Sequence, residues 1–109
     1  MKTLFIDLDG VLNTYTGDFD ENYIPPMRDG AKEFLEQLRT EYKIKIFTTR
    51  DKERAEKWVE ENGLTDLVEG VTNYKEPCYL IIDDRCVRFG GDYQNTLAQI
   101  QAYKPWYRE

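Results

Sequence analysis

The sequence predicts an α/β fold: a single domain in which helices cover both faces of a parallel sheet. Along its 109 residues, short apolar runs that are typical of strands alternate with longer segments of helical periodicity. Polar and acidic residues follow several of the apolar runs directly, as at the ends of buried strands. The chain is long enough for one hydrophobic core and too short for two, so we expect one domain over residues 1–109.

The first half of the chain contains two expected strands and one helix between them. Residues 3–8 are predicted to form the first strand, and residues 43–47 the second. Asp29 is the expected N-cap of the intervening helix. The apolar residues of that helix recur at helical spacing and are Ala31, Phe34, Leu35, Leu38 and Tyr42.

The second half contains two further helices and three short strands. Asp51 is expected to cap a helix that buries Ala55, Trp58 and Val59 and stops at residues 62–63. Strands are predicted near 67–71, at 79–82 and, as a brief edge strand, at 87–89. The last helix is expected to bury a stripe of three residues, Leu97, Ile100 and Tyr103, before a tail at 104–109.

Composition excludes several classes of function. The chain contains no histidine, which excludes Ser-His-Asp and Cys-His hydrolases, histidine phosphatases and His-ligated metal sites. The net charge of -6 and the pI near 4.7 argue against binding to nucleic acid. No apolar run approaches the roughly 20 residues of a membrane helix, and the N-terminus does not resemble a secretory signal, so we expect a soluble, cytoplasmic protein.

Polar residues gather at the expected carboxyl ends of the strands, where ligands bind in parallel sheets. Asp7 and Asp9 follow the first strand and point the same way if the extended geometry persists. Two such carboxylates about 4 Å apart repel each other by roughly 4 kcal/mol at an effective dielectric near 20, so a proton or a cation is needed. The other polar residues at the expected strand ends are Thr48, Thr49, Arg50, Lys75, Asp83 and Asp84. Each of these polar residues has an ordinary structural explanation by itself, but together they indicate a site.

Four segments resemble, in order and spacing, the four motifs of the haloacid dehalogenase (HAD) superfamily of phosphotransferases. They are "DLDGVLN", "FTTR", the lysine of "NYKEP", and "IIDDR". The resemblance extends from Phe5 to about Arg85. It implies a Rossmann-like HAD domain and a Mg²⁺-dependent phosphomonoester hydrolase that works through an aspartyl-phosphate.

The resemblance also implies a role for each motif residue. Asp7 is the expected nucleophile, and Asp9 the general acid and base, whose carbonyl oxygen also binds the metal. Asp83 is the expected direct metal ligand, and Asp84 binds the ion directly or through water; with Asp7 and Asp9 they complete an oxygen site that suits Mg²⁺. The expected phosphate-binding residues are Asp7, Leu8, Asp9, Thr48, Thr49 and Lys75. Arg50 and Arg85 are either substrate contacts or structural partners of the carboxylates.

The segments in which larger HAD enzymes carry a cap domain are short here, so no cap is expected. These segments hold only a short flap at about 13–27 and one helix. The sequence does not name the substrate, but a small phosphorylated metabolite such as a sugar phosphate or a nucleotide is favoured over a nucleic acid. We expect a monomer or a weak homo-oligomer.

A competing interpretation is a non-catalytic phosphoacceptor or phosphate-binding module of HAD-like or receiver-like type. Receiver domains also combine carboxylates, threonine, lysine and Mg²⁺ on a small α/β sheet. They place the acceptor aspartate after the third strand, whereas the third expected strand here ends near residues 72–73, which are threonine and asparagine. The order of the motifs therefore favours the hydrolase.

Overall fold

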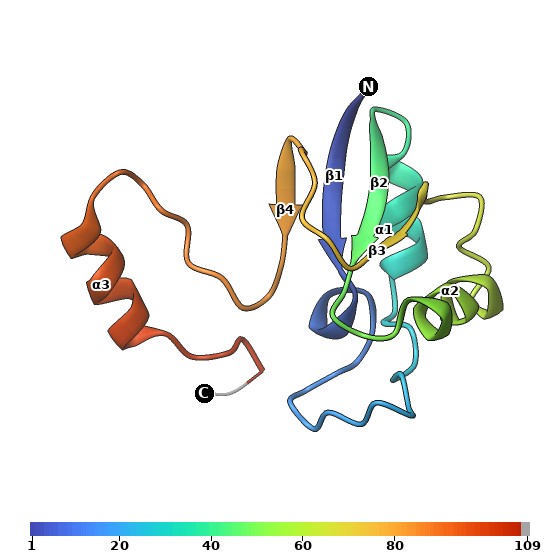
Figure 1. Ribbon diagram of the computed structural model, residues 1–109, viewed down its shortest axis with the longest axis horizontal. Coiled ribbons are helices and arrows are strands. Elements are labelled where there is room, and N and C mark those ends of the chain that lie inside the picture. Colours follow the sequence, from blue (N-terminus) through green and yellow to red (C-terminus); the bar gives the residue numbers. More distant parts are fainter. Residues whose placement is uncertain (108–109) are drawn as a thin grey trace.

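A computed structural model describes residues 1–107 and contains one four-stranded parallel sheet (Figure 1). The strands are β1 (Lys2–Asp7), β2 (Tyr42–Phe47), β3 (Gly70–Thr72) and β4 (Leu80–Ile82), in the spatial order β3-β2-β1-β4. The helices are α1 (Ala31–Leu38), α2 (Lys52–Glu61) and α3 (Tyr93–Ala102). The predicted Rossmann-like parallel sheet without a cap domain is confirmed.

Two helices cover one face of the sheet and share one core. Ala31 and Leu35 of α1, and Ala55, Trp58 and Val59 of α2, pack in the same cluster as the strand residues Ile6, Ile44 and Ile46. Because side chains alternate along a strand, Phe5 points to the opposite face, where its ring meets the Phe47 ring edge to face, with 5.5 Å between centroids. The apolar residues of the first two strands thus divide between the two faces.

The last helix is the main departure from the expected fold. No residue of α3 is buried, and Leu97 and Ile100 are 51% and 56% exposed, so the predicted buried stripe is wrong. Figure 1 shows α3 standing beyond β4, away from α1 and α2, and the expected helical cover of the second face is not seen in the described part of the chain. The helix that the periodicity predicts is present, but periodicity alone does not supply a surface for that helix to pack against.

Smaller differences concern the ends of elements. Gly30, in the left-handed conformation with φ 87°, precedes α1 in place of the expected cap Asp29, and Tyr42 begins β2 instead of ending the helix. The third strand lies three residues later than expected at its start, at Gly70. Residues 87–89 form no strand. The cap at Asp51 is confirmed, since its carboxylate accepts the Arg54 N–H at 3.1 Å.

Candidate active site

The carboxyl ends of three strands bring predicted site residues from distant motifs to one edge of the sheet. Asp7 is the last residue of β1, Thr48 follows β2, and Asp83 follows β4. Because β1 lies between β2 and β4, and all three are parallel, these residues meet where the chain order reverses. They line a cavity of about 150 Å³, whose other lining residues are Asp9, Phe47, Thr49, Ile81 and Arg85.

Three carboxylates form an acidic cluster at this edge of the sheet. Oxygens of Asp7, Asp83 and Asp84 all lie within 4.8 Å of one another. Burial, followed by the negative charges of Asp83, Asp84 and Asp9, raises the pKa of Asp7 to about 8. Burial, and then the charge of Asp83, also raises the pKa of Asp84.

The cluster fits a hard dication. Both carboxylate oxygens of Asp84 are buried without a hydrogen bond of ordinary geometry within residues 1–107, although the Trp106 side chain lies near enough to lower the pKa of Asp84. Buried carboxylate oxygens without donors are costly in a protein interior, and a bound cation removes that cost. Mg²⁺ prefers oxygen ligands of this kind, so the donor set suits the metal that the sequence predicted.

Gly10 makes room for Asp84. It lies in η1 (Leu8–Leu12), a helical turn interrupted by non-helical backbone at Asp9 and Gly10, and has φ 84°, which favours glycine. A Cβ atom at this position would collide with the Asp84 carboxylate. Glycine is therefore favoured at this position of the first motif both by the backbone conformation and by the space that Asp84 takes up.

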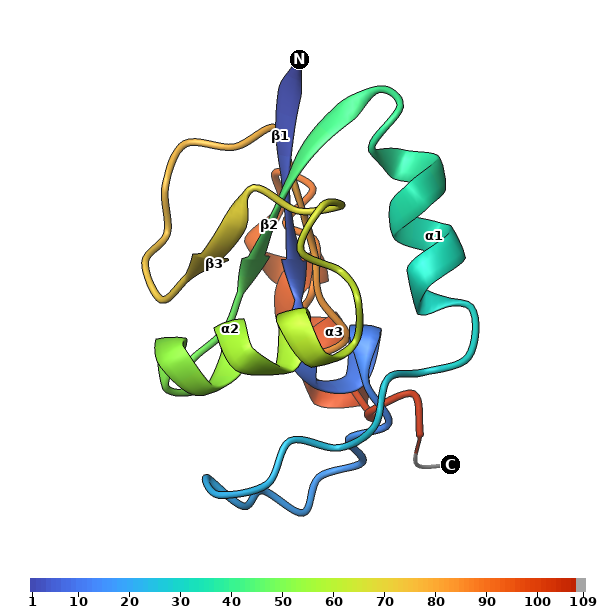
Figure 2. The ribbon, with the colours of Figure 1, turned by 90° about the vertical axis from the view of Figure 1, so that its right-hand side faces the viewer.

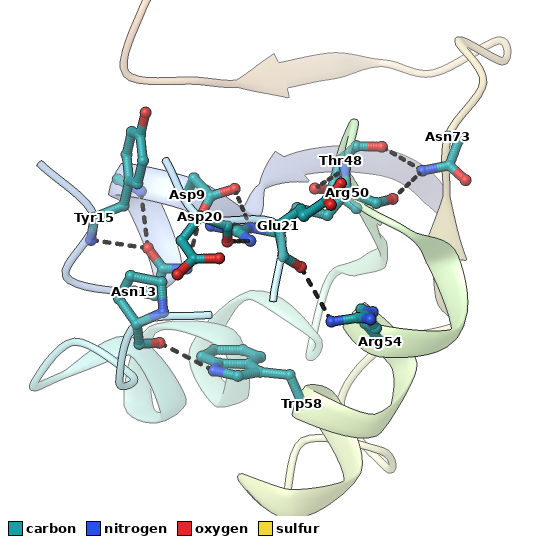
Figure 3. A network of polar contacts seen from close by, with 12 residues as sticks. Asp9, Asn13, Tyr15, Asp20, Glu21, Thr48, Arg50, Arg54, Trp58 and Asn73 are labelled. Carbon is teal, nitrogen blue, oxygen red and sulfur yellow. Dashed lines mark hydrogen bonds and ion pairs between the residues drawn. The ribbon is translucent and has the colours of Figure 1, made fainter. Parts of the chain in front are cut away.

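Asp9 has a different environment from Asp7, although only Leu8 separates them in the sequence. The contacts of Asp9 are drawn in Figure 3. Arg50 Nε donates to both of its carboxylate oxygens, at 3.0 and 2.8 Å, and Asn13 Nδ2 donates to Oδ1 at 3.0 Å. The Arg50 side chain is 2% exposed, so this ion pair is protected from solvent. Arg50 is thus a partner of a site carboxylate in this structure.

Two asparagines that sequence reasoning missed hold the site loops. Asn13 is fully buried, and its Oδ1 accepts the N–H groups of Gly10 and Tyr15 at 3.1 and 3.0 Å. Asn73 Nδ2 donates to the carbonyl oxygens of Thr48 and Arg50. The position of each asparagine directly after a motif turn or strand was a signal, because Asn often satisfies loop backbone groups.

The second-motif residues differ in exposure. Thr48 is 3% exposed and its Oγ1 accepts the Arg50 N–H at 3.1 Å, whereas Thr49 is exposed at the rim of the cavity. Leu8 is buried with its backbone in the turn after β1. Of these three residues, Thr48 and Thr49 line the cavity together with Asp7.

The structure places the two remaining basic residues differently. Arg85 lines the cavity, and its N–H donates to Asp83 Oδ1 at 2.9 Å. Lys75 is exposed in the loop between β3 and β4 and does not line the cavity. Arg85 is therefore brought to the acidic cluster, and Lys75 is not.

The flap lies beyond the carboxyl ends of the strands, beneath α2 (Figure 2). Three side chains spaced four residues apart hold it by donating to its backbone carbonyls (Figure 3). They are Arg50 to Asp20 at 3.0 Å, Arg54 to Glu21 at 3.3 Å and Trp58 to Pro25 at 3.1 Å. The flap is thus an ordered loop attached to α2.

A capless Rossmann-like sheet with this arrangement of carboxylates at its carboxyl edge defines a HAD-like phosphatase. In agreement, the family model described as NLI interacting factor-like phosphatase matches residues 2–104, and the chain belongs to that family. No curated protein and no solved structure gives a significant match. The family implies a phosphorylated substrate.

None of the helices in residues 1–107 has the length and the apolar character that crossing a membrane requires.

Proposed function

We propose that this phosphatase is a Mg²⁺-dependent phosphomonoester hydrolase that works through an aspartyl-phosphate on Asp7. Its proposed substrate is a small phosphorylated metabolite, a sugar phosphate or a nucleotide. The observation that carries the proposal is the acidic cluster of Asp7, Asp83 and Asp84, in which both Asp84 oxygens are buried. A phosphate dianion would be repelled by this cluster unless a cation were bound.

Asp83 and Asp84 would hold Mg²⁺ together with a carboxylate oxygen of Asp7 and the carbonyl oxygen of Asp9. When bound, the ion neutralises the cluster and stabilises the charge on the phosphoryl oxygens. The raised pKa of Asp7 is compatible with a role as nucleophile, because a nearby dication favours the ionised carboxylate.

In the first step, a carboxylate oxygen of Asp7 forms a bond to phosphorus as the bond to the leaving oxygen breaks. Asp9, protonated for this step, donates its proton to the leaving oxygen. In the second step, Asp9 takes a proton from water as the water oxygen attacks phosphorus, which releases phosphate and restores Asp7. The ion pair with Arg50 favours the carboxylate form of Asp9, which the second step uses, and opposes the protonated form, which the first step uses.

Phosphate contacts are proposed for the backbone at Leu8 and Thr49, for the Thr48 hydroxyl and for Lys75. Thr48 and Thr49 line the cavity beside Asp7, which supports their part. Lys75 is proposed to neutralise charge on the phosphate, because its loop begins at the carboxyl end of β3, on the same edge of the sheet.

Hydrolysis of p-nitrophenyl phosphate tests the proposal. With Mg²⁺ we expect many turnovers per protein molecule, and with EDTA we expect turnover to fall to background and to return when Mg²⁺ is added in excess. Activity that survives EDTA, with the metal content checked, would contradict the metal role. Phosphorylation that stops at one phosphoryl group per chain would instead indicate a phosphoacceptor module.

A further inference from the structure

A second cavity adjoins the catalytic one. It has a volume of about 310 Å³ and lies between the flap and the start of α2. Thr49 lines both cavities, and Arg50, which lines this one, binds Asp9, which lines the other. We call this cavity the flap pocket; its lining residues are Phe19, Glu21, Thr49, Arg50, Asp51 and Arg54.

The flap pocket lies where the leaving group of a bound substrate could sit. A phosphoryl group at Asp7 lies in the catalytic cavity, and Thr49 lies at the border between the two cavities. The organic part of the substrate must extend out of the catalytic cavity in some direction. The flap pocket lies in one such direction, and its volume is at the lower end of the range for small-molecule sites.

Phe19 gives the flap pocket an aromatic surface. Its ring lies over the guanidinium of Arg50, with 4.8 Å from the Arg50 Cζ atom to the ring centroid, and the residue is 58% exposed. The cation fixes the ring from one side, so that the exposed part of the ring is available for stacking. A planar base gains from such a surface, whereas a sugar without a base does not stack in this way.

The charges in the flap pocket disfavour a second anion. Glu21 and Asp51 each contribute a negative charge and Arg54 a positive one, while the charge of Arg50 is neutralised by Asp9. The balance is negative, and both carboxylates can accept hydrogen bonds from hydroxyl groups. A leaving group with hydroxyls is therefore favoured over one that carries another phosphate.

We propose that the flap pocket binds the nucleoside part of a nucleoside monophosphate, with the base against Phe19 and the hydroxyls toward Glu21 and Asp51. This inference rests on the proposed function, because it takes Asp7 as the site of phosphoryl transfer. It selects the nucleotide from the two substrate classes left open above, and it makes Phe19 and Glu21 specificity-determining residues.

The first test compares kcat/KM for four substrates with Mg²⁺ present: a nucleoside 5′-monophosphate, the corresponding 3′,5′-bisphosphate, ribose 5-phosphate and acetyl phosphate. Acetyl phosphate serves as the reference, because its leaving group is too small to fill the flap pocket. We expect the monophosphate to exceed ribose 5-phosphate by about 10-fold or more, in line with the stacking of one base. We expect the bisphosphate to fall below the monophosphate by about 5-fold.

The second test uses Phe19→Ala with Tyr23→Ala as a matched control. Tyr23 is an aromatic residue of the same flap, 57% exposed, and does not line the flap pocket. Phe19→Ala should lower the ratio of kcat/KM for the monophosphate to that for acetyl phosphate by about 10-fold. Tyr23→Ala should leave this ratio unchanged. Glu21→Gln should raise the relative rate for the bisphosphate by a few-fold.

The outcomes separate this inference from the proposed function. If acetyl phosphate and p-nitrophenyl phosphate are hydrolysed but ribose 5-phosphate equals or exceeds the monophosphate, the nucleoside assignment is wrong and the hydrolase stands. An unchanged ratio in Phe19→Ala would likewise overturn the role of the flap pocket. If none of the phosphates is hydrolysed, the proposed function itself fails.

Discussion

Asp7 and Asp9 are the same type of residue, follow the same strand and line the same cavity, yet their neighbours differ in charge. Around Asp7 lie Asp83 and Asp84, whose negative charges add to burial and raise its pKa to about 8. Around Asp9 lie the Arg50 guanidinium and the Asn13 amide, both of which donate hydrogen bonds to it. Position along the strand therefore does not decide the chemistry of these carboxylates; their neighbours do.

The two carboxylates also differ in how far the cations of the chain itself neutralise them. Asp9 already has its cation in Arg50, a buried residue of the same chain. Among the described residues, Arg85 is the cation that acts on the cluster of Asp7, Asp83 and Asp84, and its charge lowers the pKa of Asp7 less than the carboxylates raise it. Removal of Asp7, removal of Asp9 and displacement of Asp84 should therefore have distinct effects.

The largest effect is expected for Asp7→Asn. An amide is a much poorer nucleophile and cannot form the acyl phosphate, so kcat with p-nitrophenyl phosphate should fall by about 10⁴-fold or more. Asp66→Asn, the same substitution at an exposed residue outside the site, is the control and should retain wild-type kcat. An Asp7→Asn protein within about 10-fold of wild type would remove Asp7 from the chemistry.

Asp9→Asn should have a smaller effect on the same reaction. Nitrophenolate leaves readily without a proton, but the attacking water then lacks a base, so steady-state turnover should fall by about 10² to 10⁴-fold. Steady-state kinetics measures this loss, and the folded state is checked by thermal unfolding, because the substitution removes the charge that pairs with Arg50. Wild-type turnover in this variant would contradict the acid-base role.

Gly10→Ala tests the role of Asp84 in the acidic cluster. The added methyl group would displace the Asp84 carboxylate, so the Mg²⁺ concentration for half-maximal activity should rise by about 10-fold or more. The positive φ at this position should also cost about 1 to 2 kcal/mol of stability. Gly90→Ala is the control, since nothing lies within 4 Å of its added Cβ. Equal Mg²⁺ dependence in the two variants would argue against Asp84 as a ligand.

The smallest expected effect is a pH dependence of stability without metal. Because the pKa of Asp7 is raised from 3.8 to about 8 on folding, the folded state holds a proton that the unfolded state releases between these values. Stability in EDTA should therefore fall as the pH rises from about 4 to about 8. Asp84 contributes a slope of the same sign, because its pKa is also raised.

Thermal unfolding in EDTA measures this slope. The wild-type Tm should be lower at about pH 8 than at about pH 5, and Asp7→Asn should make that difference smaller. Asp66→Asn should keep the wild-type difference. A Tm in EDTA that rises over this range would show that Asp7 is not in the environment described.

The parts of the site that the sequence predicted are those fixed by strand ends. The apolar runs before Asp7, Thr48 and Asp83 each place a residue at the carboxyl edge once the sheet is parallel, and the structure brings these three into one cavity. The same reasoning left Arg50 undecided between substrate and structural partner. Its bond to Asp9 joins residues 41 apart and depends on how the loop after β2 folds.

The exact contacts of other residues lay beyond sequence reasoning because they depend on loop conformation or on a packing partner. The Asn13 side chain bonds to Gly10, Tyr15 and Asp9 only because the backbone turns at Gly10. The loop between β3 and β4 leaves Lys75 exposed, so its part in the site stays a prediction. Leu97 and Ile100 follow the helical period correctly, but the period does not state which surface, if any, covers them.

The central claim is that Asp7 receives the phosphoryl group while Asp9 moves the proton. Intact-protein mass spectrometry after mixing each variant with Mg²⁺ and p-nitrophenyl phosphate tests it most directly. We expect the mass of one added phosphoryl group in Asp9→Asn, where the intermediate forms but hydrolyses slowly, and no added mass in Asp7→Asn. A phosphoryl group on Asp7→Asn, or one that maps to another residue in Asp9→Asn, would contradict the claim.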